Sequence, residues 1–279
     1  LKGMNPNIHT GNVDPRIKYY WANQVEPEQL PKDHGAVRTG YPNADNWDAS
    51  TGFFTNRFGN IGPDRDHAVQ TDATFPGIFP CGGRYDDGQG FTRTITSGTG
   101  VAPRRMLTYD EFLYVQAELM QVGLLAGDAG AKLREAMTAS FTKVDQVIAG
   151  TGTSQTVPVL SGSSDVLTFM DNIDTEFAAA SSNKKLEILM TQKWTATFGD
   201  PMDQYNDYRR TGYPVLANPN GPSPEYQLDN DDGWPLIDSQ TVLNNGFQTS
   251  FFWPQREINL NQNAPSQKDA TTYSIFWDN

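Results

Sequence analysis

The sequence contains few of the residues that build disulfide frameworks or metal centres. Cys81 is the single cysteine among 279 residues, so no disulfide can form within this sequence. The three histidines, His9, His34 and His67, are widely separated, and no cysteine or histidine pair has the spacing of a zinc site. No histidine is close to Cys81 in the sequence, and we expect this thiol to be partly buried and inert. The sequence therefore predicts neither a metal nor a cofactor.

Long apolar runs and basic runs are also missing. No apolar stretch approaches the roughly 18 residues that a membrane-spanning helix needs. The net charge is −12, and the basic pairs Lys184-Lys185 and Arg209-Arg210 are isolated. Such a charge repels phosphates and anionic headgroups, which argues against nucleic-acid binding. The first residues, beginning at Leu1, carry neither a start methionine nor a signal peptide, so we expect the sequence to begin within a longer chain.

Motifs for common enzyme chemistry are not found. The sequence has no complete dinucleotide-binding fingerprint, no P-loop and no Gly-x-Ser-x-Gly element. Carboxylates are abundant, and a glycosidase that uses two of them stays open as an alternative. The acidic stretch Asp229–Asp232 lacks the alternating spacing of an EF-hand calcium loop. We interpret the acidic groups Asp86-Asp87, Asp171, Asp174 and Asp229–Asp232 as solvated turns.

The chain divides into three parts by composition. Residues 1–105 are rich in Gly, Pro, Asn and Asp, which is typical of loops. Residues 106–212 carry helical patterns, and residues 213–279 return to loops. The length allows one large domain or two small ones, and we expect a single domain over 1–279. Loops of this length carry function or pack on a scaffold.

Apolar residues at helical spacing predict a helical hairpin at the start of the middle part. Thr108 and Glu111 have the spacing of a capping box. The apolar stripe that follows predicts a helix within Leu107–Leu125, with these side chains buried: Phe112, Val115, Leu119 and Val122. A second stripe predicts a helix over Asp128–Ala149, formed by Leu133, Met137, Phe141, Val144 and Ile148. The short connection predicts that the two helices are antiparallel.

Three further helices are predicted up to residue 212. The first buries Val166, Met170, Ile173 and Phe177, and the next runs over Lys184–Phe198 with Leu186, Met190, Trp194 and Phe198 as its stripe. Trp194 is therefore predicted to be largely buried. A short helix from Pro201 has Arg209-Arg210 in its last turn and Gly212 and Pro214 after it, which is a strong stop signal.

Several sequence blocks resemble the SusD/RagB family. They are Asp14–Trp21 (DPRIKYYW), Arg105–Phe112 followed by Ala117-Glu118-Leu119, Ile188–Trp194 (ILMTQKW), Tyr208–Pro214 (YRRTGYP), and Trp253–Asn259 (WPQREIN) followed by Asn261 and Asn263. Their order and spacing are similar to those of the SusD-like branch. Trp194, Arg209 and Arg210 in these blocks fit a helical scaffold, so we assign these residues to the fold and not to ligand contact.

The resemblance implies a mainly α fold of tetratricopeptide-like helical hairpins with long irregular loops, here without its N-terminal portion. It implies a surface-exposed lipoprotein of the outer membrane of a Gram-negative bacterium. Its partner would be a SusC-like TonB-dependent transporter, and its ligand an oligosaccharide, or a peptide in some relatives. Neither catalysis nor a cofactor is implied.

The ligand site is expected on the loops of the first hundred residues. Sugars have apolar faces and hydroxyl-bearing edges, so aromatic rings together with Asn, Asp and Arg suit them. The candidate ligand-binding residues are Tyr41, Asn46, Trp47, Asp48, Arg84, Tyr85 and Asp87. Two other classes stay open: a hydrolase that uses paired carboxylates, and a helical protein–protein adaptor.

Overall fold

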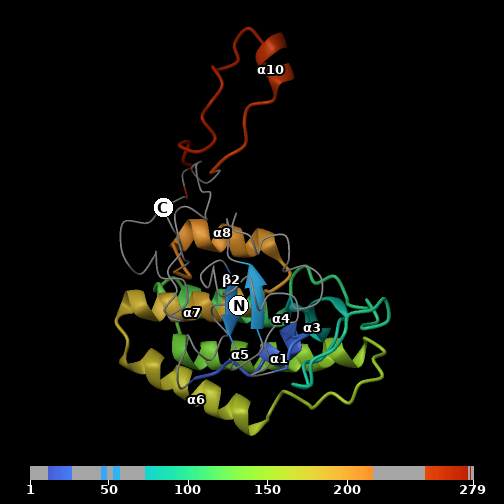
Figure 1. The fold of residues 1–279 in the computed structure, drawn as a ribbon. Coiled ribbons are helices and arrows are strands. Elements are labelled where there is room, and N and C mark those ends of the chain that lie inside the picture. Colours follow the sequence, from blue (N-terminus) through green and yellow to red (C-terminus); the bar gives the residue numbers. More distant parts are fainter. Residues whose placement is uncertain are drawn as a thin grey trace.

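The computed structural model describes residues 12–26, 73–215, 249–275 and 277, and the strands at 45–48 and 53–56. Figure 1 shows a body of packed helices in this part of the chain, with a C-terminal arm extending from it. The mainly helical fold predicted from the sequence is confirmed.

Four helices form the body, namely α4 (Tyr109–Gln121), α5 (Ala129–Ala149), α6 (Ser164–Ala179) and α7 (Ser182–Ala196). The hairpin of α4 and α5 is confirmed, and α4 packs mainly against α5 and α7. The capping box is also confirmed, with the Thr108 N–H donating to Glu111 Oε2 at 3.4 Å. At the start of α5, Asp128 Oδ1 accepts hydrogen bonds from the N–H groups of Gly130 and Ala131. Local side chains therefore define where both helices of the hairpin begin.

Helix α8 (Pro201–Thr211) follows the predicted start and stop signals. Pro201 occupies the first turn, where its missing N–H is not needed. Arg209 and Arg210 lie in the last turn, and Gly212 ends the helix in the left-handed conformation with φ of 75°. The arm of residues 249–275 carries α10 (Gln255–Leu260) and lies away from the helical body in Figure 1.

The described part of the first hundred residues contains only short elements. Helix α1 (Ile17–Tyr20) leads into β1 (Trp21–Ala22), which pairs antiparallel with β4 (Phe75–Pro76) just before α3 (Ile78–Cys81). Strands β2 (Asp45–Asp48) and β3 (Phe53–Asn56) form a second antiparallel pair. These described elements are two to four residues long, and the loop-dominated character of residues 1–105 as a whole stays a prediction.

The short N-terminal elements complete the helical core. The rings of Tyr20 and Phe79, from α1 and α3, stack with their centroids 4.6 Å apart. Both side chains are fully buried, together with Leu133, Met137 and Phe141 of α5. Segments that lie far apart in sequence therefore share one hydrophobic core with α5.

The predicted apolar stripe of α4 is wrong. Phe112, Val115 and Val122 are exposed, whereas Leu113, Tyr114 and Ala117 face the core. The sequence offers apolar residues on both sides of this helix. The side that also carries Asp110 and Glu118 packs inward, because Lys143 and Arg210 provide ion-pair partners for these carboxylates there.

Two further expectations about burial are corrected. Of the predicted stripe of α7, Met190 is fully buried, whereas Leu186, Trp194 and Phe198 are only partly buried. Ile188, Leu189 and Ala196 also pack inward. The polar residues Gln192 and Lys193 share this inward side because they have buried polar partners, which a purely apolar stripe does not anticipate. Cys81 is exposed and not partly buried, although local desolvation still raises the pKa of its thiol.

Candidate ligand-binding surface

A tightly anchored loop after α3 carries three of the candidate residues. Gly82 ends α3 in the left-handed conformation, and a Cβ at this position would lie 2.4 Å from the Val101 nitrogen. Further along, the Asp86 N–H donates to the Lys18 carbonyl of α1 at 2.9 Å. The loop from Gly82 to Gly90 is thus held against the rest of the protein at its start and at Asp86.

Arg84 and Asp87 are brought together on the surface of this loop. Arg84 Nη2 lies 3.2 Å from Asp87 Oδ2, and the two side chains are 29% and 41% exposed. The Arg84 guanidinium also lies over the ring of Phe91, at 5.3 Å from its centroid. The Arg84 guanidinium carries several N–H donors in one plane, and the Asp87 carboxylate beside it is an acceptor. Together they can hydrogen-bond the hydroxyl groups of a polar ligand.

Tyr85 is anchored more firmly than its neighbours. Its N–H and C=O both bind the side-chain amide of Gln155, at 2.9 and 3.2 Å. Its ring centroid is 4.9 Å from that of Tyr19, and partial burial raises the pKa of the Tyr85 hydroxyl. Because the ring packs against the core, Tyr85 offers a ligand only part of its surface.

The acidic pair Asp86-Asp87 separates into two environments. Asp86 Oδ2 accepts from Asn23 Nδ2 at 2.7 Å, and Oδ1 accepts from the Gly88 N–H at 3.0 Å. Burial raises the pKa of Asp86. Asp86 therefore organises the loop, and Asp87 is the carboxylate that faces solvent.

Two acidic residues of α6 are also engaged within the protein. Asp171 and Asp174 both form ion pairs with Arg134 of α5. The interpretation of Asp171 and Asp174 as solvated turns is therefore wrong, because both lie on a helix and pair with one arginine. The acidic stretch Asp229–Asp232 lies outside the described residues.

The other candidate residues are only partly described. Tyr41 lies outside the described residues. Asn46, Trp47 and Asp48 lie on β2, where the backbone pairing places Trp47 opposite Phe54 of β3. The structure thus brings Arg84, Tyr85 and Asp87 together on one loop, whereas the contribution of the Trp47 hairpin stays a prediction.

Sequence reasoning missed a polar junction at the N-terminal end of α4. A small pocket there has a free volume of about 10 Å³, roughly enough for one water molecule. It is lined in part by Arg105, Glu111, Lys143 and Phe198. Lys143 Nζ already donates hydrogen bonds to Asp110 Oδ2 at 2.5 Å and to the Ala196 carbonyl at 2.9 Å. The charged residues Arg105, Glu111 and Lys143 come from the segment before α4, from α4 and from α5, so they gave no local motif, and the pocket has little room beyond one water molecule.

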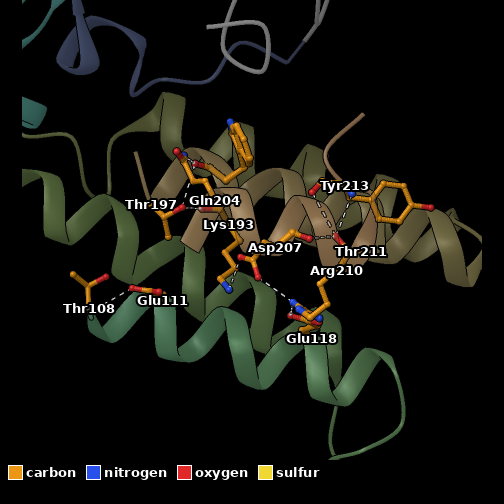
Figure 2. A network of polar contacts seen from close by, with 11 residues as sticks. Thr108, Glu111, Glu118, Lys193, Thr197, Gln204, Asp207, Arg210, Thr211 and Tyr213 are labelled. Carbon is orange, nitrogen blue, oxygen red and sulfur yellow. Dashed lines mark hydrogen bonds and ion pairs between the residues drawn. The ribbon is translucent and has the colours of Figure 1, made fainter. Parts of the chain in front are cut away.

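Residues of three of the sequence blocks meet in one ion-pair network, shown in Figure 2. Arg210 of α8 binds both carboxylate oxygens of Glu118 on α4, and its Nη2 also lies 3.0 Å from Asp207. Asp207 in turn pairs with Lys193 of α7, with Nζ at 2.7 Å from Oδ2. The blocks around Glu118, Lys193 and Arg210 therefore tie three helices together, as their assignment to the fold predicts.

A fourth block is buried in the core. Arg16 is fully buried and pairs with Asp14, whose Oδ2 lies 2.6 Å from Nη2. The same guanidinium donates to Ser140 Oγ at 3.2 Å and to Gln192 Oε1 at 3.1 Å. It also lies over the Phe141 ring, at 4.9 Å. A buried cation with this many partners is structural, and it fixes α1 to α5 and α7.

Metal sites and membrane spans were sought in the same part of the chain. Within the described ranges, no group of three or more His, Cys, Asp and Glu side chains is arranged to bind a metal ion. No helix formed by the described residues is both long and apolar enough to cross a membrane.

Comparison with solved structures identifies the fold. A SusD homologue from Bacteroides fragilis is 22% identical, with a TM-score of 0.53, and the match covers 93% of this chain and 47% of that one. A second SusD homologue from the same species is 16% identical, with a TM-score of 0.52 and coverages of 95% and 48%. A candidate nutrient-binding outer-membrane protein of Bacteroides vulgatus is 18% identical, with a TM-score of 0.52 and the same coverages. This chain thus spans about half the length of the structures that it matches.

Comparison with sequence families gives the assignment. No curated protein sequence matches the chain. The model of a SusD-like family, described as "Starch-binding associating with outer membrane", matches residues 7–230. Because this match covers most of the sequence and the helical fold agrees with it, the chain belongs to the SusD-like family.

Proposed function

We propose that this chain is part of a surface glycan-binding component of a SusC/SusD-type nutrient uptake complex, and that it captures oligosaccharides for import without cleaving them. The single observation that carries the proposal is the family match over residues 7–230, whose description names starch binding and the outer membrane. On this proposal the protein is a lipid-anchored surface protein of a Gram-negative outer membrane. Its partner is a TonB-dependent transporter of the SusC type.

The loop after α3 supports a binding role. Arg84 and Asp87 present a donor and an acceptor at the surface, and Phe91 backs the guanidinium. Neutral sugars need both kinds of group at their edges and an aromatic face for stacking. We assign the edge contacts to Arg84 and Asp87, and the stacking face to Trp47 on β2.

The described carboxylates give the hydrolase alternative little support. Asp86 uses both oxygens to accept hydrogen bonds from Asn23 and Gly88, and Asp171 and Asp174 share Arg134. A glycosidase needs two carboxyl groups facing each other across the sugar, with one free to donate a proton. A peptide-binding member of the same family has no feature in its favour among the described residues.

Calorimetry against a panel of neutral oligosaccharides tests the proposal. We expect Arg84→Ala and Trp47→Ala to weaken binding several-fold, since each removes one contact of about 0.5–1.5 kcal/mol. Arg134→Ala is the matched control, because Arg134 is similarly exposed and is also paired with aspartates. Unchanged affinity in both site variants would remove this surface from the site. Release of reducing ends by the purified protein would contradict a purely binding function.

A further inference from the structure

Arg93 is held in place by the buried side chain of Gln24. The Gln24 carbonyl accepts from the Phe91 N–H at 3.2 Å, and its Oε1 accepts from the Arg93 N–H at 3.3 Å. Its Nε2 donates to the Ala73 carbonyl at 3.0 Å, two residues before Phe75 of β4. One buried glutamine therefore joins the backbone at Arg93 to the segment that carries Phe75.

Three arginines between α3 and α4 each lie over a phenylalanine ring. Their guanidinium carbons are 5.3, 4.9 and 4.5 Å from the ring centroids, for Arg84 over Phe91, Arg93 over Phe75 and Arg105 over Phe79. A ring covers one face of the planar guanidinium and leaves the N–H donors at its edge available.

These three arginines differ in their polar partners. Arg84 is paired with Asp87, and Arg105 lies within hydrogen-bond distance of two backbone carbonyls. The guanidinium of Arg93 has neither a hydrogen bond nor a carboxylate partner among the described residues, and this residue is exposed. Arg93 is therefore a cation with a supported position and unused donors.

The charge around Arg93 contrasts with that of the whole chain. Residues 88–107 contain three arginines, no lysine and neither aspartate nor glutamate, within a chain whose net charge is −12. Arginines elsewhere in the described ranges are paired with carboxylates, as at Arg16, Arg134 and Arg210. A local excess of positive charge on an acidic protein attracts an anionic group to this place.

We propose that Arg93 forms a subsite for the carboxylate of an acidic oligosaccharide, beside the hydroxyl contacts assigned to Arg84 and Asp87. The inference rests on the proposed glycan-binding function and narrows its ligand class to glycans that contain a uronic acid. Arg93 is close to these contacts, because Phe91, which lies under Arg84, is bound to the same Gln24. The planar fork of arginine matches the two oxygens of a carboxylate.

Matched neutral and acidic ligands test the proposal on the full-length protein. Maltohexaose, cellohexaose and mannohexaose are each compared by calorimetry with the same oligosaccharide after oxidation of its primary hydroxyl groups to carboxylates. The net charge of −12 alone would make every acidic form bind more weakly. We expect the opposite order in at least one pair, by about threefold, which is typical of an exposed ion pair. The preference should shrink in about 1 M salt, where the screening length is about 3 Å.

Substitutions at two exposed arginines separate a local contact from a general charge effect. Arg93→Gln should lower the ratio of acidic to neutral affinity about threefold. Arg256→Gln is the matched control, because it changes the net charge equally but lies on α10 of the arm, away from the helical body (Figure 1). Arg93→Lys keeps the charge without the planar fork and should retain only part of the preference. Melting temperatures of the three variants verify that the fold is kept.

The outcomes distinguish this inference from the proposed function. Neutral forms that bind as tightly as the acidic forms, or more tightly, in every pair would overturn the subsite and leave glycan binding intact. An unchanged ratio in Arg93→Gln would overturn it too, as would an equal fall in Arg256→Gln. Failure of both members of every pair to bind would contradict the proposed function together with the subsite.

Discussion

Arg210 binds Glu118 with both of its terminal nitrogens, across 92 residues of sequence. The Glu118 side chain is only 10% exposed, whereas that of Arg210 is 40% exposed. Asp207, one turn before Arg210 on α8, accepts from the same guanidinium at 3.0 Å. The planar fork of arginine thus holds α8 to α4 at two points, which a lysine cannot reproduce.

We expect Arg210→Lys to lower the free energy of unfolding by about 1 kcal/mol, because Glu118 loses one hydrogen bond in a poorly hydrated position. Arg134→Lys is the matched control, since Arg134 is similarly exposed but pairs with the more exposed Asp171 and Asp174. It should change stability by less than about 0.5 kcal/mol. Urea denaturation of both variants measures the difference, and equal losses would refute a special role for the Glu118 contact.

Arg16→Met should be among the most damaging single substitutions. It removes the cation and leaves the Asp14 carboxylate buried without its partner, at a cost of about 3–5 kcal/mol. The double variant Asp14→Asn with Arg16→Met should regain part of that loss, because the buried charge is then gone. A double-mutant cycle by denaturant unfolding tests this, and strict additivity of the two single changes would show that the pair is not coupled.

The stability of the fold should fall as the pH rises from about 4.3 to 7. Burial and a hydrogen bond with Asp203 raise the pKa of Glu111 to about 7, against about 4.3 for an unfolded glutamate. Between these values the folded state keeps a proton that the unfolded state has lost, so folding is favoured less at the upper end.

Glu111→Gln should therefore reduce the decrease in melting temperature between pH 5 and pH 8. Glutamine also preserves the capping box, because its side chain can still accept from the Thr108 N–H. Glu176→Gln, on the exposed side of α6, is the control and should follow the natural protein. The same pH dependence in Glu111→Gln would exclude Glu111 as its source.

Trp194→Ala should be less destabilising than Leu189→Ala, although tryptophan is the larger residue. Leu189 is fully buried in the core, so its truncation should cost about 2–5 kcal/mol. Trp194 is only partly buried, and we expect a loss of about 1–2 kcal/mol there. Thermal unfolding of the two variants decides the order, and a larger loss at Trp194 would restore the sequence-based prediction.

The positions of the helices could be predicted because their signals are local. The Thr108–Glu111 capping box and the Pro201 and Gly212 signals of α8 act within a few residues, and the structure confirms all of them. Which face of a helix packs inward is not local. Helix α4 has two apolar sides, and the choice depends on Lys143 and Arg210, which lie on other helices.

The same limit applies to the candidate ligand-binding surface. The ion pair of Arg84 with Asp87 spans three residues, so a sequence can suggest it. The half-buried position of Tyr85 depends on hydrogen bonds between its backbone and the side chain of Gln155, which is 70 residues away. A local sequence pattern cannot predict such a contact. Tyr41 lies outside the described residues, and the ligand contacts of Asn46, Trp47 and Asp48 remain predictions.

The buried position of Arg16 has a consequence for the order of events on the ribosome. Asp14 and Arg16 leave the exit tunnel long before Ser140 and Gln192, which lie 124 and 176 residues after Arg16. At about 5–20 residues per second, roughly ten seconds or more separate the synthesis of Arg16 from that of Gln192. During this interval the guanidinium stays hydrated, because the interior that will enclose it does not yet exist. Arg16 therefore cannot reach its buried and fully paired position before α5 and α7 have been synthesised.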